Sequence, residues 1–147
     1  MQHYPHLTSA KAALLLAAVA IALCPASASA QIRRWDNNEV IPGTEDIDLS
    51  DSNLVLDGLD LSFADLRNQS FRDASIRGTV LTNAVLTDSD FKRAVFDDAV
   101  ITGASFAEAL FDSFTKEQLY STASYRLRNL NGINLSENTL AGWDFSG

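Results

Sequence analysis

The chain has 147 residues, of which 19 are acidic and 11 are basic, so its formal net charge at pH 7 is −8. An acidic balance of this size argues against a nucleic-acid partner, because such partners are bound through basic patches. The one Cys and both His residues lie before residue 31, so the rest of the chain lacks the side chains for disulfides, Cys or His catalysis and Cys/His zinc sites.

Residues 1–30 have the pattern of a secretory signal peptide. A polar start is followed by a compact apolar run from Ala12 to Leu23 and then by alternating small residues up to Ala30. This arrangement predicts cleavage between Ala30 and Gln31, and the apolar run is short for a membrane-spanning helix. We therefore expect an exported protein (periplasmic, extracellular or cell surface) with no stable membrane insertion after cleavage.

Cleavage would also change the charge balance. Loss of Lys11 lowers the number of basic residues from 11 to 10 while the acidic residues stay at 19, which leaves a net charge of about −9. A lipid anchor on Cys24 is the alternative to cleavage at Ala30, although the bulky Leu23 fits that processing site poorly.

Residues 31–53 form a polar lead-in with a few large apolar residues. Pro42-Gly43 is a turn signal within it. We expect Trp35 and Ile41 to pack as an N-terminal cap, because the open end of a stack of repeats exposes apolar surface and unpaired backbone.

From residue 54 to residue 113 a large apolar residue recurs at every fifth position, and a second, mostly small residue precedes it by two. A step of five scatters side chains around an α-helix and alternates their face in a straight strand. A chain that bends once per repeat can bury them all, and such short units must stack in a solenoid. The twelve centres are Leu56, Leu61, Leu66, Phe71, Ile76, Leu81, Leu86, Phe91, Phe96, Ile101, Phe106 and Phe111.

The segment Ala64-Asp65-Leu66-Arg67-Asn68 resembles the A-(D/N)-L-x-x unit of the pentapeptide-repeat proteins, and weaker copies begin at Ala84 and Ala94. The resemblance implies an all-β chain folded as a right-handed quadrilateral β-helix with four repeats per coil. Residues twenty positions apart would then stack in columns, and residues 54–113 would make three coils. One inner column would contain Phe71, Phe91 and Phe111.

The outward positions carry the charges and a group of valines. Stacking by twenty places Arg77 between Asp57 and Asp97 and sets Asp73 beside Arg93. Exposed pairs of this kind contribute only about 0–1 kcal/mol each, so a solvated face is the plainer interpretation. Four valines expected near two adjacent faces form a candidate partner surface, for another protein or for a second copy of the chain, although valine also suits strands for its own sake. These are Val80, Val85, Val95 and Val100.

Residues 114–128 are predicted to form a helical connector. Thr115 followed by Gln118 is a capping-box pattern, and apolar residues at near-helical spacing predict a short helix over about residues 116–124. The five-residue pattern returns at Leu130 with a shifted phase, so residues 129–147 form a second, incomplete repeat block. This tail and the lead-in are similar to segments of exported bacterial pentapeptide-repeat proteins.

The sequence contains no catalytic, cofactor-binding or metal-binding constellation. It has no Gly-rich phosphate loop, and neighbouring acids such as Asp88 and Asp90 are typical of a solvated surface rather than of a calcium site. We expect a non-catalytic exported scaffold, structural or protein-binding, with an unidentified protein partner. The alternative, implied only by the family resemblance, is an acidic DNA mimic that binds a topoisomerase, but a signal peptide would send that protein to the wrong compartment.

Overall fold

The computed structural model describes residues 31–109 and 113–146. The predicted signal peptide, its cleavage site after Ala30 and the repeat centre Phe111 lie outside the described residues. Each of these therefore stays a prediction.

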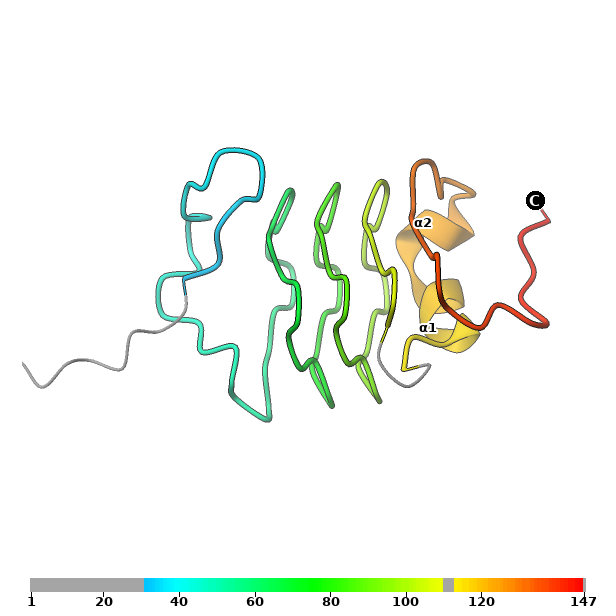
Figure 1. Ribbon diagram of the computed structural model, residues 1–147, viewed down its shortest axis with the longest axis horizontal. Coiled ribbons are helices and arrows are strands. Elements are labelled where there is room, and N and C mark those ends of the chain that lie inside the picture. The colour runs from blue at the N-terminus through cyan, green and yellow to red at the C-terminus, as the bar shows by residue number, and fades with distance from the viewer. Residues whose placement is uncertain (1–30, 110–112, 147) are drawn as a thin grey trace, which may run out of the picture.

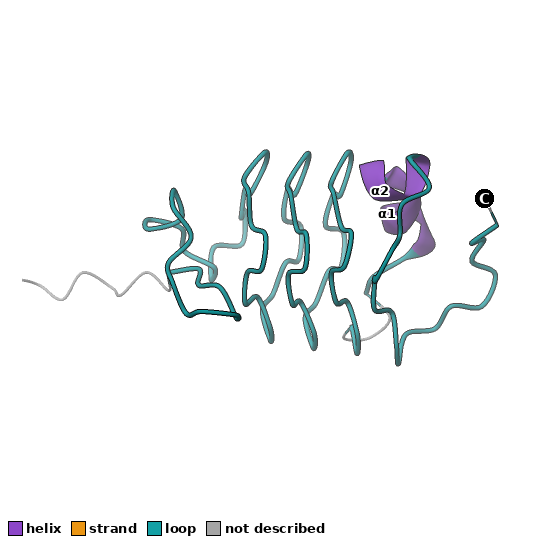
Figure 2. Cartoon of the chain, turned by 90° about the horizontal axis from the view of Figure 1, so that it is seen from above, coloured by secondary structure: helices purple, strands orange, loops and turns teal. Residues whose placement is uncertain are grey.

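Residues 54–109, the trunk, wind into successive coils that lie side by side along one axis (Figures 1 and 2). Parallel backbone bridges join residues twenty positions apart, as in the column of Val55, Ser75 and Val95. Each coil donates to both of its neighbours: Leu86 N–H donates to Ser105 O of the next coil at 2.8 Å, and Val85 N–H donates to Ala64 O of the preceding coil at 2.9 Å. The remaining columns are Asp60, Val80 and Val100; Asp65, Val85 and Ser105; and Ser70 with Asp90.

Pairing between the coils takes the form of single bridges, and the described residues contain no strand of several residues. This differs from the expectation of an all-β chain. The physical reason is the bend in every repeat. Each face offers one small inward residue, one outward residue and one inward centre before the next turn, and only the outward residue forms a bridge.

A β-turn separates each repeat from the next. Ala64 N–H donates to Leu61 O at 3.0 Å across the residues between them, and Phe63 at the third turn position has a φ of 62°. A left-handed residue falls two positions after each described centre from Leu56 to Phe106, which is the type II turn geometry. The turn resets the inward face, and this explains how a period of five can bury every centre.

The eleven described centres are all 0–1% exposed. The residues two positions earlier are mostly alanines, which let neighbouring faces approach each other. Where this position is polar, its hydroxyl is satisfied: Thr79 donates to Leu56 O at 2.8 Å, and Ser89 donates to Leu66 O at 3.0 Å. The expected Phe column is present in its described part, because the Phe71 and Phe91 rings stack at 5.6 Å with an interplanar angle of 2°.

The N-terminal lead-in covers the first coil through a hairpin in which Arg33 pairs with Val40. Ile41 is buried in the core, as expected for a cap residue. The expectation for Trp35 holds only in part, because the residue is 49% exposed and not buried in the core. Its indole lies along the outside of the trunk, where it packs near Phe63 and donates to Asn83 O at 2.7 Å. Trp35 therefore ties the hairpin to two successive coils.

Two short helices follow the trunk: α1, Lys116–Ser121, and α2, Ala123–Arg126. The predicted capping box is present, because Gln118 N–H donates to Thr115 Oγ1 at 3.4 Å and Thr115 N–H donates to Gln118 Oε1 at 2.8 Å. The single expected helix is broken at Thr122, whose backbone is extended and whose hydroxyl oxygen caps α2. No helix among the described residues is long and apolar enough to cross a membrane.

Residues 113–138, the helical coil, stack directly on the end of the trunk (Figure 1). Asp98 N–H donates to Ser121 O at 3.0 Å, and Gly103 N–H donates to Asn131 O at 2.9 Å. Gly103 and Asn131 are 28 residues apart, whereas the equivalent pair one coil earlier, Asn83 and Thr102, is 19 residues apart. The helical coil therefore holds nine extra residues, which accounts for the shifted phase at Leu130.

Phe114 closes the core between the trunk and the helical coil. It is 2% exposed, and its ring stacks on Phe106 at 4.3 Å and meets Phe91 edge-on at 5.7 Å. It occupies the position before the N-cap Thr115, where a hydrophobic residue commonly pairs with the fourth helical residue, here the buried Leu119. The same residue thus sets the entry into α1 and fills the last inner layer.

Candidate functional site

The four candidate valines of the trunk lie in three neighbouring columns, not on two faces. Val80 and Val100 are bridged to each other, Val85 lies in the next column with Asp65 and Ser105, and Val95 lies in the column of Ser75. All four are half-buried. The more exposed valine is Val55, at 62%, which the sequence analysis did not single out. The structure therefore brings together only Val80 and Val100 as direct neighbours.

The outward charges of the trunk largely pair with one another. Arg93 makes a two-point contact with Asp73, with both nitrogen–oxygen distances at 2.6 Å, and this hydrogen bonding holds the pKa of Asp73 below its ordinary value. Arg77 Nε lies 3.5 Å from Asp97 Oδ2, and its backbone N–H donates to Asp57 Oδ1 at 2.8 Å. The expected ladders are thus present and leave few free charges on the trunk.

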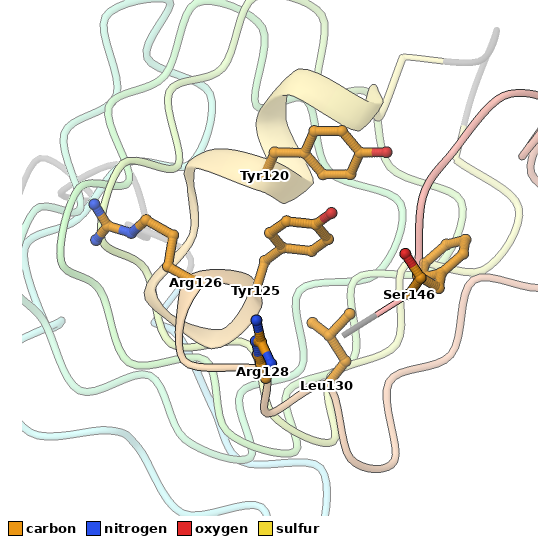
Figure 3. A pocket seen from close by; sticks show the side chains of 7 residues that line it. Tyr120, Tyr125, Arg126, Arg128, Leu130 and Ser146 are labelled. Carbon is orange, nitrogen blue, oxygen red and sulfur yellow. The ribbon is translucent and has the colours of Figure 1, made fainter.

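A hollow lined by the side chains shown in Figure 3 lies beside the two helices, which are at the opposite end of the stack from the N-terminal hairpin (Figure 1). This C-terminal cavity has a volume of about 390 Å³. Side chains of α1, α2, the turn after α2 and the last described residues line it. They are Tyr120, Tyr125, Arg126, Arg128, Leu130, Phe145 and Ser146.

The two tyrosines form one wall of the C-terminal cavity and hold the opposite wall. Their rings stack with centroids 4.4 Å apart and an interplanar angle of 28°. Tyr125 Oη donates to Asp144 O at 2.9 Å, and Asp144 N–H donates to Tyr120 Oη. Burial, with the nearby Tyr120 and Asp144 as further causes, raises the pKa of the Tyr125 phenol, so the Tyr125 hydroxyl is neutral at physiological pH.

The two arginines of the C-terminal cavity have different surroundings. Arg126 pairs with Asp98 of the trunk, and Figure 3 shows it directed away from the tyrosine rings. Arg128 follows the C-cap of α2 with a φ of 56°, and the bonds Arg128 N–H to Tyr125 O and Asn129 N–H to Ser124 O form a Schellman motif. The Arg128 side chain has no hydrogen-bond or ion-pair partner among the described residues.

The sequence pattern does not predict this site, for a geometric reason. Tyr120 and Tyr125 are five residues apart, which in one continuous helix would separate their directions by about 140°. The break at Thr122 turns the chain between them and lets the rings stack. The clustering of Tyr, Arg and Phe in the tail was a compositional signal, since these residue types are enriched in protein interfaces.

The stacked coils with one turn per five residues define a repeat protein. Residues 45–88 and 80–113 match the family model described as pentapeptide repeats, in 8 copies. The match identifies residues 45–113 as repeats of the pentapeptide-repeat family, and the family implies a β-helix fold.

Two further comparisons accompany the family match. The chain is similar to the crystal structure of a pentapeptide repeat protein (Rfr23) from the cyanobacterium Cyanothece 51142, at 22% identity and a TM-score of 0.25. The match covers 61% of this chain and 54% of that chain, so this chain spans about half the length of that structure. A comparison with curated proteins gives no match.

Proposed function

We propose that this chain is an exported, non-catalytic pentapeptide-repeat scaffold that binds another protein. The observation that carries the proposal is the C-terminal cavity, where stacked tyrosines, the half-exposed Phe145 and Arg128, an arginine without a partner among the described residues, surround one hollow. Aromatic residues and arginine are the types enriched at protein interfaces and at their energetic centres. A rigid stack of coils supports such a surface, because a preorganised site loses little entropy when it binds.

The finer form of the fold is part of the same proposal. The bridges at intervals of twenty residues and the four columns of paired outward residues support a quadrilateral β-helix with four repeats per coil. The right-handed sense comes from the family resemblance. The non-catalytic part is supported by the sequence after residue 30, which has neither thiol nor imidazole groups.

Export is supported by the sequence of residues 1–30 and is tested by fractionation. The full chain with a C-terminal tag is expressed in a bacterium, and the tagged product is followed by immunoblotting and N-terminal sequencing. We expect a product outside the cytoplasm that begins at Gln31. Uncleaved protein in the cytoplasm would contradict export and favour the alternative of an acidic DNA mimic that binds a topoisomerase.

Protein binding is tested by site-specific photocrosslinking in cells that naturally make the protein. The photoreactive residue p-benzoylphenylalanine replaces Phe145 in one variant and the exposed trunk residue Asn68 in a matched control. We expect one defined protein crosslinked from position 145 and not from position 68. Equal crosslinking from both positions, or none from position 145, would contradict the proposal.

A further inference from the structure

We propose that the C-terminal cavity binds a segment of a partner protein in which an aromatic side chain is flanked by a carboxylate. The aromatic ring packs against the tyrosine pair, Leu130 and Phe145, and the carboxylate pairs with Arg128. This inference rests on the proposed function and specifies the chemistry of the partner.

The charge complementarity comes from the contrast between Arg128 and the other arginines. Residues 31–109 and 113–146 contain eight arginines, and six of them form ion pairs with carboxylates of the same chain. Arg33 donates to Asn38 O and Gln31 Oε1 instead. Only Arg128 among these described arginines has no side-chain partner, in a chain whose acids outnumber its bases by 19 to 11. Arg128 therefore offers a carboxylate from outside a guanidinium that no described residue engages.

Asp144, whose backbone bonds both tyrosines of the cavity, makes no ion pair with Arg128 and bonds Ser146 instead. Asp144 Oδ1 accepts hydrogen bonds from Ser146 N–H at 2.8 Å and from Ser146 Oγ at 2.6 Å. These bonds hold the pKa of Asp144 below its ordinary value and leave it as a local cap of the last described turn. An incoming carboxylate thus meets Arg128 without displacing an existing pair.

The apolar part of the C-terminal cavity matches a ring in size and in shape. Its volume of about 390 Å³ lies at the lower end of small-ligand pockets, which run from about 300 to 1,000 Å³. Phe145 stacks on Trp143 at 6.1 Å yet is 49% exposed, so one of its faces is free to pack on a ligand. The two hydrogen bonds between the tyrosine hydroxyls and the backbone of Asp144 fix the positions of the walls before anything binds.

The backbone at Arg128 offers a way to separate binding from folding. Position 128 is left-handed and closes a Schellman motif, where glycine is the favoured residue. Arg128→Gly should therefore keep or raise the melting temperature while it removes the guanidinium. A variant that is more stable and binds less well cannot be explained by misfolding.

The test is a fluorescence-anisotropy titration of the purified chain with a fluorescein-labelled peptide of sequence Gly-Asp-Phe-Glu-Gly. We expect saturable binding that weakens about tenfold or more in Arg128→Gln and Arg128→Gly, the range of a lost charge-assisted hydrogen bond. The matched control Arg33→Gln removes an arginine from the opposite end and should bind like the unchanged chain. Peptides with Lys in place of both acids, or Ala in place of Phe, should bind at least about tenfold more weakly.

Two outcomes would overturn the inference. One is no saturable binding of the acidic aromatic peptide by the unchanged chain. The other is equal affinity in the chain with and without the Arg128 side chain. If crosslinking from position 145 persists in either case, the proposed function stands and only the chemistry of the partner is wrong. If the crosslinks are also absent, both proposals fail.

Discussion

The trunk and the helical coil both form coils that stack on a neighbouring coil, but their chain segments differ in length. In the trunk every described repeat ends in a turn with a left-handed residue, and the outward residues from Val55 to Val85 each pair with the residue twenty positions on. The helical coil contains nine extra residues and two helices, yet its backbone meets the trunk at Asp98 and again at Gly103. The comparison teaches that the stack requires matched backbone contacts at its faces, and tolerates an insertion between them.

The largest expected effect comes from a charge in the inner layer of the trunk. Leu66 is fully buried, so Leu66→Asp places an unpaired carboxylate in the core and should cost more than about 4 kcal/mol, enough to prevent folding. The control Asn68→Asp lies two residues on, at a turn position that Asp already occupies at residues 73, 88 and 98. Circular dichroism melts compare the two variants, and equal loss of structure would mean that the assigned inward direction is wrong.

The junction between the trunk and the helical coil should depend on one side chain. Gln118 completes the capping box and also donates from Nε2 to Phe91 O and Ala94 O, each at 2.8 Å. Gln118→Ala should lower the free energy of unfolding by about 2–3 kcal/mol, from one cap and two hydrogen bonds. Urea denaturation measures this loss. The control is Glu117→Ala at the exposed neighbouring position, which should change stability by less than about 0.5 kcal/mol. If Gln118→Ala has no larger effect than this control, Gln118 does not stabilise the junction.

Two glycines of the trunk test how closely the corners stack. Gly78 and Gly103 both have positive φ, so alanine should cost about 1–2 kcal/mol at either position. A Cβ at Gly103 would also meet Asn83 Oδ1 of the preceding coil, whereas a Cβ at Gly78 would meet nothing. We expect Gly103→Ala to be the more destabilising substitution in urea denaturation. The additional loss of unfolding free energy should disappear in the double variant Gly103→Ala with Asn83→Gly. If the effects of the two substitutions on the free energy of unfolding simply add, the clash is ruled out.

The smallest expected effect is the dependence of stability on acid. Hydrogen bonding to Arg93 lowers the pKa of Asp73 from its ordinary 3.8, and bonds from Arg67 and Ser62 do the same for Asp65 and Asp60. A carboxylate whose pKa is lower in the folded state than in the unfolded state stabilises the fold at pH values above its unfolded-state pKa. This contribution is lost as the pH falls through the folded-state pKa. The melting temperature should therefore decrease below about pH 4, by less in Asp73→Asn and in Arg93→Gln than in the unchanged chain. An unchanged slope in both variants would mean that the pair does not contribute.

Much of the trunk could be predicted because its rule is local and repeated. The centres and their small companions at residues such as Leu81 and Thr79 follow from the period of five and the need to bury each apolar side chain. The helix start at Thr115 was predictable for the same reason, because a capping box involves four consecutive residues. Trp35 was not, since its partners Phe63 and Asn83 are distant in the sequence and only the stacking of coils brings them together.

The C-terminal cavity belongs entirely to the tertiary structure. Its tyrosines become neighbours only through the break at Thr122, and the second wall comes from residues around Asp144 that the tyrosine hydroxyls hold in place. The sequence by itself determined the spacing of the buried residues, because a period of five admits one way to hide them all. The placement of the nine extra residues and the surface that they form were decided by the fold, since the backbone of the trunk fixes the two points at which the helical coil contacts it.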